Sequence, residues 1–386
     1  MGPQADAIPT ATISDSATLL VSFELSRKSW LLTVQPPHRA SLSRHSVAPG
    51  GLERVSAVLQ RHREEAERRL GRRVEIVAIY EAGLDGFWLH RWLEGQAIRS
   101  QVVDPASILG PQRRRNAKTD RIDGRKMVRS LGSWLDGDRS ACSMLVPPSP
   151  EQEDARRLSR EREELKREHT RMTNRIGGLL ANQGVVGFDP KKDTVAKLEA
   201  LRTGDGRAVM PNLKASIGRM LQRLALLAEQ IKTVEAERDA LLRAQPEQAS
   251  PETAMGQQLF QLRGIGPEFA TVLPLECFYK HFDNRRQLAA FAGLAPTPWA
   301  SGSIEREQGI SKAGNRRLRK TLVELAWGWT MHQSGSALAR WFEDKVAGQS
   351  RRLRRIAIVA LARKLLVALW RYVHEGVVPE GAVFKR

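Results

Sequence analysis

The chain has 386 residues, more than one ordinary hydrophobic core accommodates, so we expect two or three domains. Its 62 Lys and Arg residues outnumber its 43 Asp and Glu residues, and the formal net charge of +19 indicates a polyanionic partner, with nucleic acid favoured over a membrane surface. No run of eighteen apolar residues is present and Cys142 and Cys277 lie far apart, which excludes a membrane-spanning helix, a disulfide framework and a zinc site and favours a cytoplasmic protein.

Residues 1–17 lack a basic start followed by an apolar stretch, so they predict a disordered arm rather than a secretory signal. From residue 18, two apolar runs flank a turn at Ser26 to Ser29, which indicates an antiparallel hairpin. Helical and strand patterns then alternate: a helix over 52–71, a strand over 74–81, a short helix over 86–94, a strand over 98–104, an arginine-rich loop over 111–118 and a helix starting near Asp120. Residues 18–146 therefore predict an α/β domain with a mixed sheet of ribonuclease H type.

Four carboxylates stand out in this region because each lies where a strand ends or a helix begins. Glu24 and Glu81 come at the ends of apolar runs, while Asp120 and Asp123 are three apart at a helix start and share one helix face. Like charges held close together repel, and a divalent cation with oxygen ligands such as Mg²⁺ neutralises them. The pattern predicts a metal-dependent site for phosphate esters. Ordinary roles stay open: a surface salt bridge for Glu24, and complementing the helix dipole for the two Asp residues.

The composition changes after the prolines at 147, 148 and 150. Residues 151–180 are densely charged and predict a long helix, and a Gly- and Pro-containing segment over 184–211 leads into a second long helix. The apolar residues of that second helix follow steps of three and four, as in a coiled-coil seam: Ile217, Met220, Leu224, Leu227, Ile231, Val234 and Leu241. We expect residues 147–250 to form a helical insert. The two helices either pair as an antiparallel arm, mediate dimerisation, or pack as ordinary bundle helices.

A linker at 246–252 precedes a C-terminal domain, residues 251–386, that we expect to be mainly helical. Its opening carries Gly264-Ile265-Gly266 between two helical patterns, the layout of a helix-hairpin-helix whose turn amides grip a phosphate. A tight interhelical turn that needs glycine for backbone freedom explains the same residues. The sequence leaves both interpretations open.

Residues 291–319 predict a Gly- and Pro-punctuated loop that runs into a basic helix. Ser301, Ser303 and Ser311 lie among glycines and cations, where a phosphate can approach a hydroxyl closely. A nucleophilic serine and a loop whose serines only donate hydrogen bonds to DNA both fit this pattern. The residues alone do not decide between them, because the base that activates a serine is not visible in a sequence.

Two blocks of the chain resemble the IS110 family of insertion-sequence transposases, which also includes the Piv-type DNA invertases. The N-terminal block resembles the family's RuvC-like DEDD domain and ends in its K-T-D-x-x-D element, here residues 118–123. The C-terminal block resembles its transposase domain, with L-x-G-I-G at 262–266, F-A-G-L-x-P at 291–296, S-G at 301–302 and G-I-S-K-x-G-N-x-x-L-R at 309–319. With the helical insert between them, these blocks cover nearly the whole chain.

The resemblance implies that Glu24, Glu81, Asp120 and Asp123 bind Mg²⁺ (or Mn²⁺), and that Ser301 forms a covalent phosphoserine link to DNA. It implies donor and target DNA and a structured noncoding guide RNA as partners, and action at the bacterial nucleoid. It also implies a homo-oligomer in which dimers assemble into a tetramer, with the metal site of one protomer completing the serine site of another. The residues expected to bind nucleic acid are Arg113, Arg114, Arg115, Lys118, Gly264, Gly266, Lys312, Arg316, Arg317 and Arg319.

One position departs from the family pattern. The first acidic residue is usually Asp, in a sequence like I-D-V-S-K, and here it is Glu24 in F-E-L-S-R-K. Since Mg²⁺ demands near-ideal geometry, a side chain one methylene longer shifts or weakens such a site, or binds through water. The alternatives to an RNA-guided recombinase are therefore a RuvC-like metal-only nuclease, a Piv-like invertase and, in another class, a nonenzymatic nucleic-acid-binding protein.

Overall fold

The computed structural model describes residues 17–83, 86–108, 120–193, 195–245, 247, 249–301 and 304–385, without the side chains of 106, 120–123, 298–301 and 304–308. The chain divides into two compact units, Met1–Pro148 (unit 1) and Ser149–Arg386 (unit 2). Within the described residues, no helix is both long enough and apolar enough to cross a bilayer.

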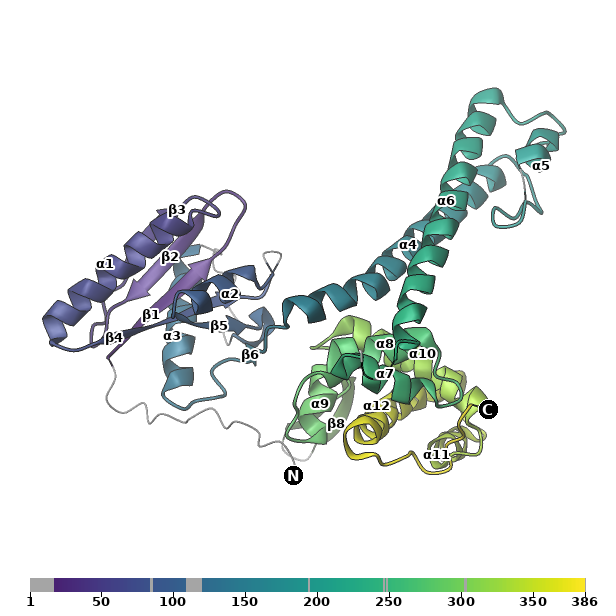
Figure 1. The fold of residues 1–386 in the computed structure, drawn as a ribbon. Helices are drawn as coiled ribbons and strands as arrows, with labels where there is room; N and C mark the ends of the chain where they lie inside the picture. The colour runs from purple at the N-terminus through teal and green to yellow at the C-terminus, as the bar shows by residue number, and fades with distance from the viewer. Residues whose placement is uncertain are drawn as a thin grey trace. The chain divides into compact units, whose positions relative to one another are not determined.

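Unit 1 is built on a mixed six-stranded sheet (Figure 1). Its strands are β1 (Ala17–Glu24), β2 (Trp30–Gln35), β3 (Ser43–Val47), β4 (Val74–Glu81), β5 (Arg99–Val103) and β6 (Met144–Leu145). They lie in the order β3-β2-β1-β4-β5-β6, with β1, β4 and β5 parallel to one another and the other pairings antiparallel. The predicted α/β fold with a mixed sheet is confirmed.

Helices cover both faces of this sheet. They are α1 (Leu52–Leu70), α2 (Trp88–Gly95) and α3 (Asp120–Leu135), with a short helix η1 (Pro105–Ser107) after β5. One core joins α1 and α2 to the odd-numbered residues of β1, and the other joins α3 to Val77, Ile79 and Val103. Strand β4 is buried on both faces, which explains its nearly continuous apolar run.

The sequence misses two strands of unit 1. Strand β3 pairs with β2 although its sequence, SRHSV, is mostly polar, because an edge strand with only partly buried side chains needs little apolar content. Strand β6 is two residues long and pairs antiparallel with β5. The expected arm is also one residue too long, since Ala17 already begins β1.

Unit 2 begins with two long helices, α4 (Pro150–Ala181) and α6 (Pro211–Leu242), joined through a segment that holds the short helix α5 (Val195–Ala200). The pair is antiparallel and forms the arm visible in Figure 1: Ile176 near the end of α4 packs with Ile217 near the start of α6, and Arg162 on α4 bonds to Glu235 on α6. A serine capping box at Ser149 and Pro150 at the first position start α4.

The predicted seam of α6 is correct over most of its length. Ile217, Met220, Leu224, Leu227 and Val234 are buried, whereas Ile231 is half-buried. Leu241, at the end of the helix, is 45% exposed and does not belong to the seam. The antiparallel arm is thus confirmed, and its role in dimerisation stays a prediction.

The rest of unit 2 is a helical bundle around one apolar core that includes Trp329, Phe342 and Leu365. Its helices are α7 (Pro251–Phe260), α8 (Pro267–Leu273), η3 (Pro274–Phe278), α9 (Arg285–Phe291), α10 (Arg316–His332), α11 (Ala337–Val346) and α12 (Arg351–Glu375). The arm belongs to the same compact unit as this bundle, so a domain boundary at residue 250 stays a prediction.

The loop predicted between residues 291 and 315 is wrong over most of its length. Residues Pro296–Ser301 form β7 and Ile304–Ile310 form β8, an antiparallel two-stranded hairpin that we call the serine hairpin. Prolines and glycines in this segment indicate a loop, but a shift in register between Pro296 and Pro298 accommodates them within the hairpin. Gly309 adopts a φ of +87° at this irregularity, and its carbonyl accepts a hydrogen bond from Thr297 Oγ1.

Candidate active site

Glu24 and Glu81 lie side by side at the carboxyl ends of neighbouring parallel strands. The register of β1 and β4 pairs Phe23 with Tyr80, so the next residue of each strand is one of the two glutamates. Glu24 is half-buried and Glu81 is exposed. This end of the sheet, where ligands bind in open α/β sheets, is called the carboxylate edge below.

Both glutamates also lie on the face of the sheet that α3 covers. Side chains alternate along a strand, and Val77 and Ile79, which precede Glu81 at even spacing, pack with α3. On β1, the Ser22 hydroxyl donates to the carbonyl oxygen of Gly124 in α3, 3.1 Å away, and Glu24 follows two residues later.

The first turn of α3 reaches Glu24 because residue 124 is glycine. A Cβ atom at Gly124 would lie 2.6 Å from Oε1 of Glu24 and closer still to Oγ1 of Thr33, so no larger residue fits without movement. Helix α3 begins at Asp120, which places the backbone of Asp120 and Asp123 in the turn that leads into this contact. Three separate segments thus converge on the carboxylate edge.

The positions of Asp120 and Asp123 are known from the helix backbone, whereas their side chains fall outside the described set. Among the side chains that the structure does describe, no three His, Cys, Asp or Glu groups gather in a way that could hold a metal. The arginine-rich loop with Arg113, Arg114, Arg115 and Lys118 also lies outside the described residues.

Ser301 is the last residue of β7 and pairs with Ile304, the first residue of β8. Its side chain, like Gly302 and Ser303, is beyond the described residues. Ser311 follows β8, and its backbone N–H donates to the carbonyl oxygen of Ala295, 2.9 Å away, which closes the base of the hairpin. The fold therefore presents Ser301 at a hairpin tip rather than within a loop.

Two glycines lock the base of this hairpin to the start of α10. Gly293 and Gly314 have φ angles of +65° and +131°, and a Cβ atom at Gly314 would lie 2.6 Å from the carbonyl oxygen of Phe291 and 2.7 Å from the Gly293 nitrogen. The Asn315 backbone N–H donates to the same Phe291 carbonyl, and its side chain caps α10 at Leu318. The F-A-G-L and S-K-A-G-N segments therefore fold against each other.

The basic residues near the contact between the serine hairpin and α10 have different roles. Lys312 and Arg316 are exposed, and Lys312 has a φ of +55°. Arg319 extends across Gly293 and donates from Nη1 to the carbonyl oxygen of Lys312, 3.0 Å away, so it holds the loop that presents Lys312. These contacts leave Lys312 and Arg316 facing solvent.

Arg317 is committed to contacts within the chain. Its side chain is 16% exposed, donates to Glu163 on α4 at 2.8 Å and to Glu276 on η3 at 2.9 Å, and donates to the Ser159 carbonyl oxygen at 2.8 Å. Arg160 on α4 binds Glu276 with two further hydrogen bonds of 2.9 and 3.0 Å. Burial alone would raise the pKa of the Glu276 carboxyl, but these two arginines hold that pKa below its ordinary value. This network joins the arm to α10.

The Gly264-Ile265-Gly266 turn lies between α7 and α8, as expected. Gly264 has a φ of +86°, and a Cβ atom there would lie 2.8 Å from Cβ of His332, so backbone conformation and close approach both require glycine. The C-terminal segment packs on this turn, with the Lys385 ammonium donating to the Ile265 carbonyl oxygen at 2.8 Å. The contacts account for Gly264 by local structure, and a phosphate-binding role of Gly264 and Gly266 stays a prediction.

Comparison with known proteins adds the family. The family model described as Transposase IS116/IS110/IS902 matches residues 256–341, which include the serine hairpin and the start of α10. The protein y4rJ of Sinorhizobium fredii, whose name marks it as a candidate transposase, is 51% identical over 98% of this chain and 97% of its own length. The transposases for insertion sequence elements IS1328 of Yersinia enterocolitica and IS1111A of Coxiella burnetii are 27% and 26% identical, over 74% and 77% of this chain and 80% and 77% of their own lengths. The chain belongs to the IS116/IS110/IS902 family of transposases.

Proposed function

We propose that this transposase cuts and rejoins DNA through a phosphoserine intermediate at Ser301, assisted by Mg²⁺ or Mn²⁺ at a RuvC-like site of Glu24, Glu81, Asp120 and Asp123. The carboxylate edge supports the proposal: Glu24 and Glu81 end neighbouring parallel strands, and Asp120 and Asp123 belong to the first turn of α3, which contacts Glu24 at Gly124. Carboxylates gathered in this way repel one another until a cation neutralises them.

The donor set fits the ion. Four carboxylates offer the oxygen ligands that Mg²⁺ prefers, and the missing Cβ of Gly124 makes room for the longer side chain of Glu24 beside α3. When bound, the ion would supply Lewis-acid stabilisation of charge on the phosphate oxygens. The strand order supports the ribonuclease H interpretation of unit 1. Strands β3, β2 and β1 pair antiparallel in sequence, and β4 and β5 follow parallel to β1.

The serine supplies the covalent step. Oγ of Ser301 forms a bond to phosphorus as the bond from phosphorus to the departing deoxyribose oxygen breaks; the hydroxyl proton is released, and the departing oxygen takes up a proton. The phosphoserine ester conserves the energy of the broken bond, so a hydroxyl of another DNA strand displaces the serine without ATP. Lys312 and Arg316 bind backbone phosphates beside the serine hairpin, while Arg317 and Arg319 position this region.

The family resemblance supports the remaining features of the proposal. A structured noncoding RNA pairs with donor and target DNA, dimers assemble into a tetramer, and the carboxylates of one protomer act with the serine of another. The excess of basic residues suits a protein that binds two kinds of nucleic acid. Arg113, Arg114, Arg115 and Lys118 then line the nucleic-acid path before α3.

A metal-only nuclease is the second candidate, because all four carboxylates belong to unit 1, which has hydrophobic cores of its own. Such an enzyme hydrolyses DNA with water and leaves free ends. It makes no covalent adduct, and replacing Ser301 leaves cleavage intact. These outcomes separate the two candidates.

The test is adduct formation in a purified system. Full-length protein is incubated with Mg²⁺, labelled DNA that spans an end of the element, and RNA transcribed from the flanking noncoding region, and protein-linked DNA is scored on a denaturing gel. Ser301→Ala should abolish the adduct while leaving DNA binding unchanged, and Ser311→Ala is the matched control. Retention of the adduct in Ser301→Ala assigns the nucleophile to another residue.

A further inference from the structure

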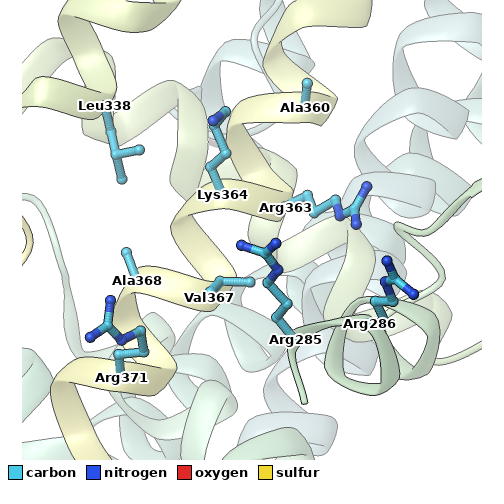
Figure 2. Close-up of a pocket in the computed structure, with 9 residues that line it drawn as sticks. All are labelled: Arg285, Arg286, Leu338, Ala360, Arg363, Lys364, Val367, Ala368 and Arg371. Atoms are coloured by element: carbon cyan, nitrogen blue, oxygen red, sulfur yellow. The ribbon is translucent and has the colours of Figure 1, made fainter. Parts of the chain in front are cut away.

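A pocket of about 620 Å³ on the bundle of unit 2 is lined by five basic side chains (Figure 2). They come from α9 and α12: Arg285, Arg286, Arg363, Lys364 and Arg371. The remaining lining is aliphatic, with Leu338 on α11 and Ala360, Val367 and Ala368 on α12. Among the residues that the structure describes, none from the serine hairpin or the carboxylate edge lines this basic pocket.

The described residues that line the basic pocket include no carboxylate. Arg371 donates to Glu375 at 2.8 Å, and the Lys364 ammonium lies 4.7 Å from the centre of the Trp341 ring. Within the described part of the chain, Arg285, Arg286 and Arg363 form no ion pair with an acidic side chain. Like charges that line one pocket raise the free energy of the free protein, and a bound polyanion lowers it.

In a second pocket of unit 2, by contrast, carboxylates lie among the cations. That pocket, about 660 Å³ in volume, is also lined by basic residues of α4 and α10, but Glu163, Glu268 and Glu324 lie among them. Arg162 and Arg317 are there paired with carboxylates at 2.5 to 3.1 Å. We call it the mixed pocket; Arg162, Arg167, Arg317 and Lys320 there pair with carboxylates of the chain, in contrast to Arg285, Arg286 and Arg363 of the basic pocket.

The geometry of α12 suits an extended anionic strand. Arg363 and Arg371 are eight residues apart, a rise of about 12 Å along the helix axis. One strand of a duplex places a phosphate about every 3.4 Å along its axis, so this distance spans roughly three to four phosphates. Ala360, Val367 and Ala368 add apolar lining to the pocket without polar groups of their own, so a sugar can approach closely. Figure 2 shows Arg285 extending from α9 toward Val367, with Arg286 and Arg363 beside it.

From these observations we propose that the basic pocket binds the phosphodiester backbone of a nucleic acid at a second site, separate from the serine hairpin. The proposal rests on the proposed function only in taking nucleic acid as the partner of this chain. DNA and RNA offer the same phosphate chemistry, and the test below distinguishes them. Because the contacts go to phosphates, binding at this site is independent of sequence.

The test compares two double variants of the full-length protein with equal loss of charge. Arg285→Gln with Arg363→Gln alters the basic pocket, and Arg167→Gln with Lys320→Gln alters exposed residues of the mixed pocket that pair with carboxylates. Binding to a DNA duplex, single-stranded DNA and RNA of arbitrary sequence is measured over a range of salt concentrations. Affinity falls as salt rises, and the slope of log affinity against log salt is steeper when more phosphates are contacted. With at least one of these probes, the basic-pocket variant should make this slope shallower by about 1.8, since each of two lost phosphate contacts on a duplex contributes about 0.9. The mixed-pocket variant should leave the slope unchanged.

Arg285→Lys with Arg363→Lys keeps the charge and should restore binding, which separates charge from folding defects. Equal slopes for the two Gln variants with all three probes would overturn the proposal. Serine-adduct formation at saturating DNA is scored in parallel. If the basic pocket binds nucleic acid but the protein forms no serine adduct, this inference stands and the proposed chemistry is wrong. If the protein forms the adduct but the basic-pocket variant binds nucleic acid as the control does, only this inference is wrong.

Discussion

At the scale of single residues, the contact between Gly124 and Glu24 connects the fold with the proposed chemistry. The sequence indicates the four carboxylates because strand ends and helix starts are readable from local patterns. It does not indicate that Gly124 matters, since a contact between residues 100 positions apart leaves no local signal. The same holds for Arg317, which looks like a phosphate ligand in a basic helix and instead binds Glu163 and Glu276.

Gly124→Ala should impair Mg²⁺-dependent DNA cleavage. The new Cβ lies 2.6 Å from Oε1 of Glu24, so either the carboxylate or the first turn of α3 has to move. Gly132→Ala in the same helix is the control, because its Cβ would lie 3.5 Å from Cδ1 of Leu20, an ordinary contact, and alanine favours the helix by up to about 1 kcal/mol. Cleavage rate and thermal unfolding are measured for both variants. Equal rates in the two would show that the approach of α3 to Glu24 has no role in activity.

Glu276→Gln should destabilise unit 2 by about 3 kcal/mol, because Arg160 and Arg317 lose a buried, charged partner. Glu324→Gln, whose carboxylate is 58% exposed and 3.9 Å from Lys320, should change stability by less than about 1 kcal/mol. Denaturant unfolding of the full chain provides the comparison.

The same experiment has a pH dependence with a defined sign. The pKa of Glu276 is lowered in the folded protein, so its contribution is complete above the ordinary value of 4.5 and disappears as pH falls through the lower folded value. The difference between wild type and Glu276→Gln should therefore shrink below about pH 4.5. A difference that stays constant as the pH is lowered well below 4.5 would contradict the assignment.

At the scale of elements, helices were easier to predict than the serine hairpin. The arm helices are long, periodic and bounded by Pro150 and Pro211, so local sequence specifies them. Strands β7 and β8 contain several prolines and glycines, and their pairing depends on a register shift and on the close packing of Gly293 against Gly314. Such tertiary features override local propensity.

Leu224→Ala should destabilise the arm by about 2–5 kcal/mol, since Leu224 is 4% exposed within the cluster that joins α4 and α6. Leu226→Ala, two residues away and 54% exposed, should change stability by no more than about 0.5 kcal/mol. Hydrogen exchange on peptides from α4 and α6 measures the effect locally. Similar exchange rates in the two variants would mean that the predicted seam does not hold the arm together.

At the scale of the whole molecule, the sequence predicts a chain of several parts with a basic character, and the structure resolves two compact units with separate cores. The four carboxylates belong to unit 1 and Ser301 to unit 2. The sequence could not reveal the basic pocket, because its cations come from α9 and α12 and are some 80 residues apart. Only the bundle brings them together.

The central claim is that Ser301 and the carboxylates of unit 1 act on one DNA linkage. Mass spectrometry of the protein–DNA adduct after proteolysis tests it most directly, with wild type and Asp120→Ala compared at equal DNA occupancy. We expect a nucleotide on the peptide that contains Ser301 in wild type, and no adduct in Asp120→Ala. A nucleotide on a different residue, an adduct that persists in Asp120→Ala, or cleaved DNA with free ends and no adduct would contradict the account.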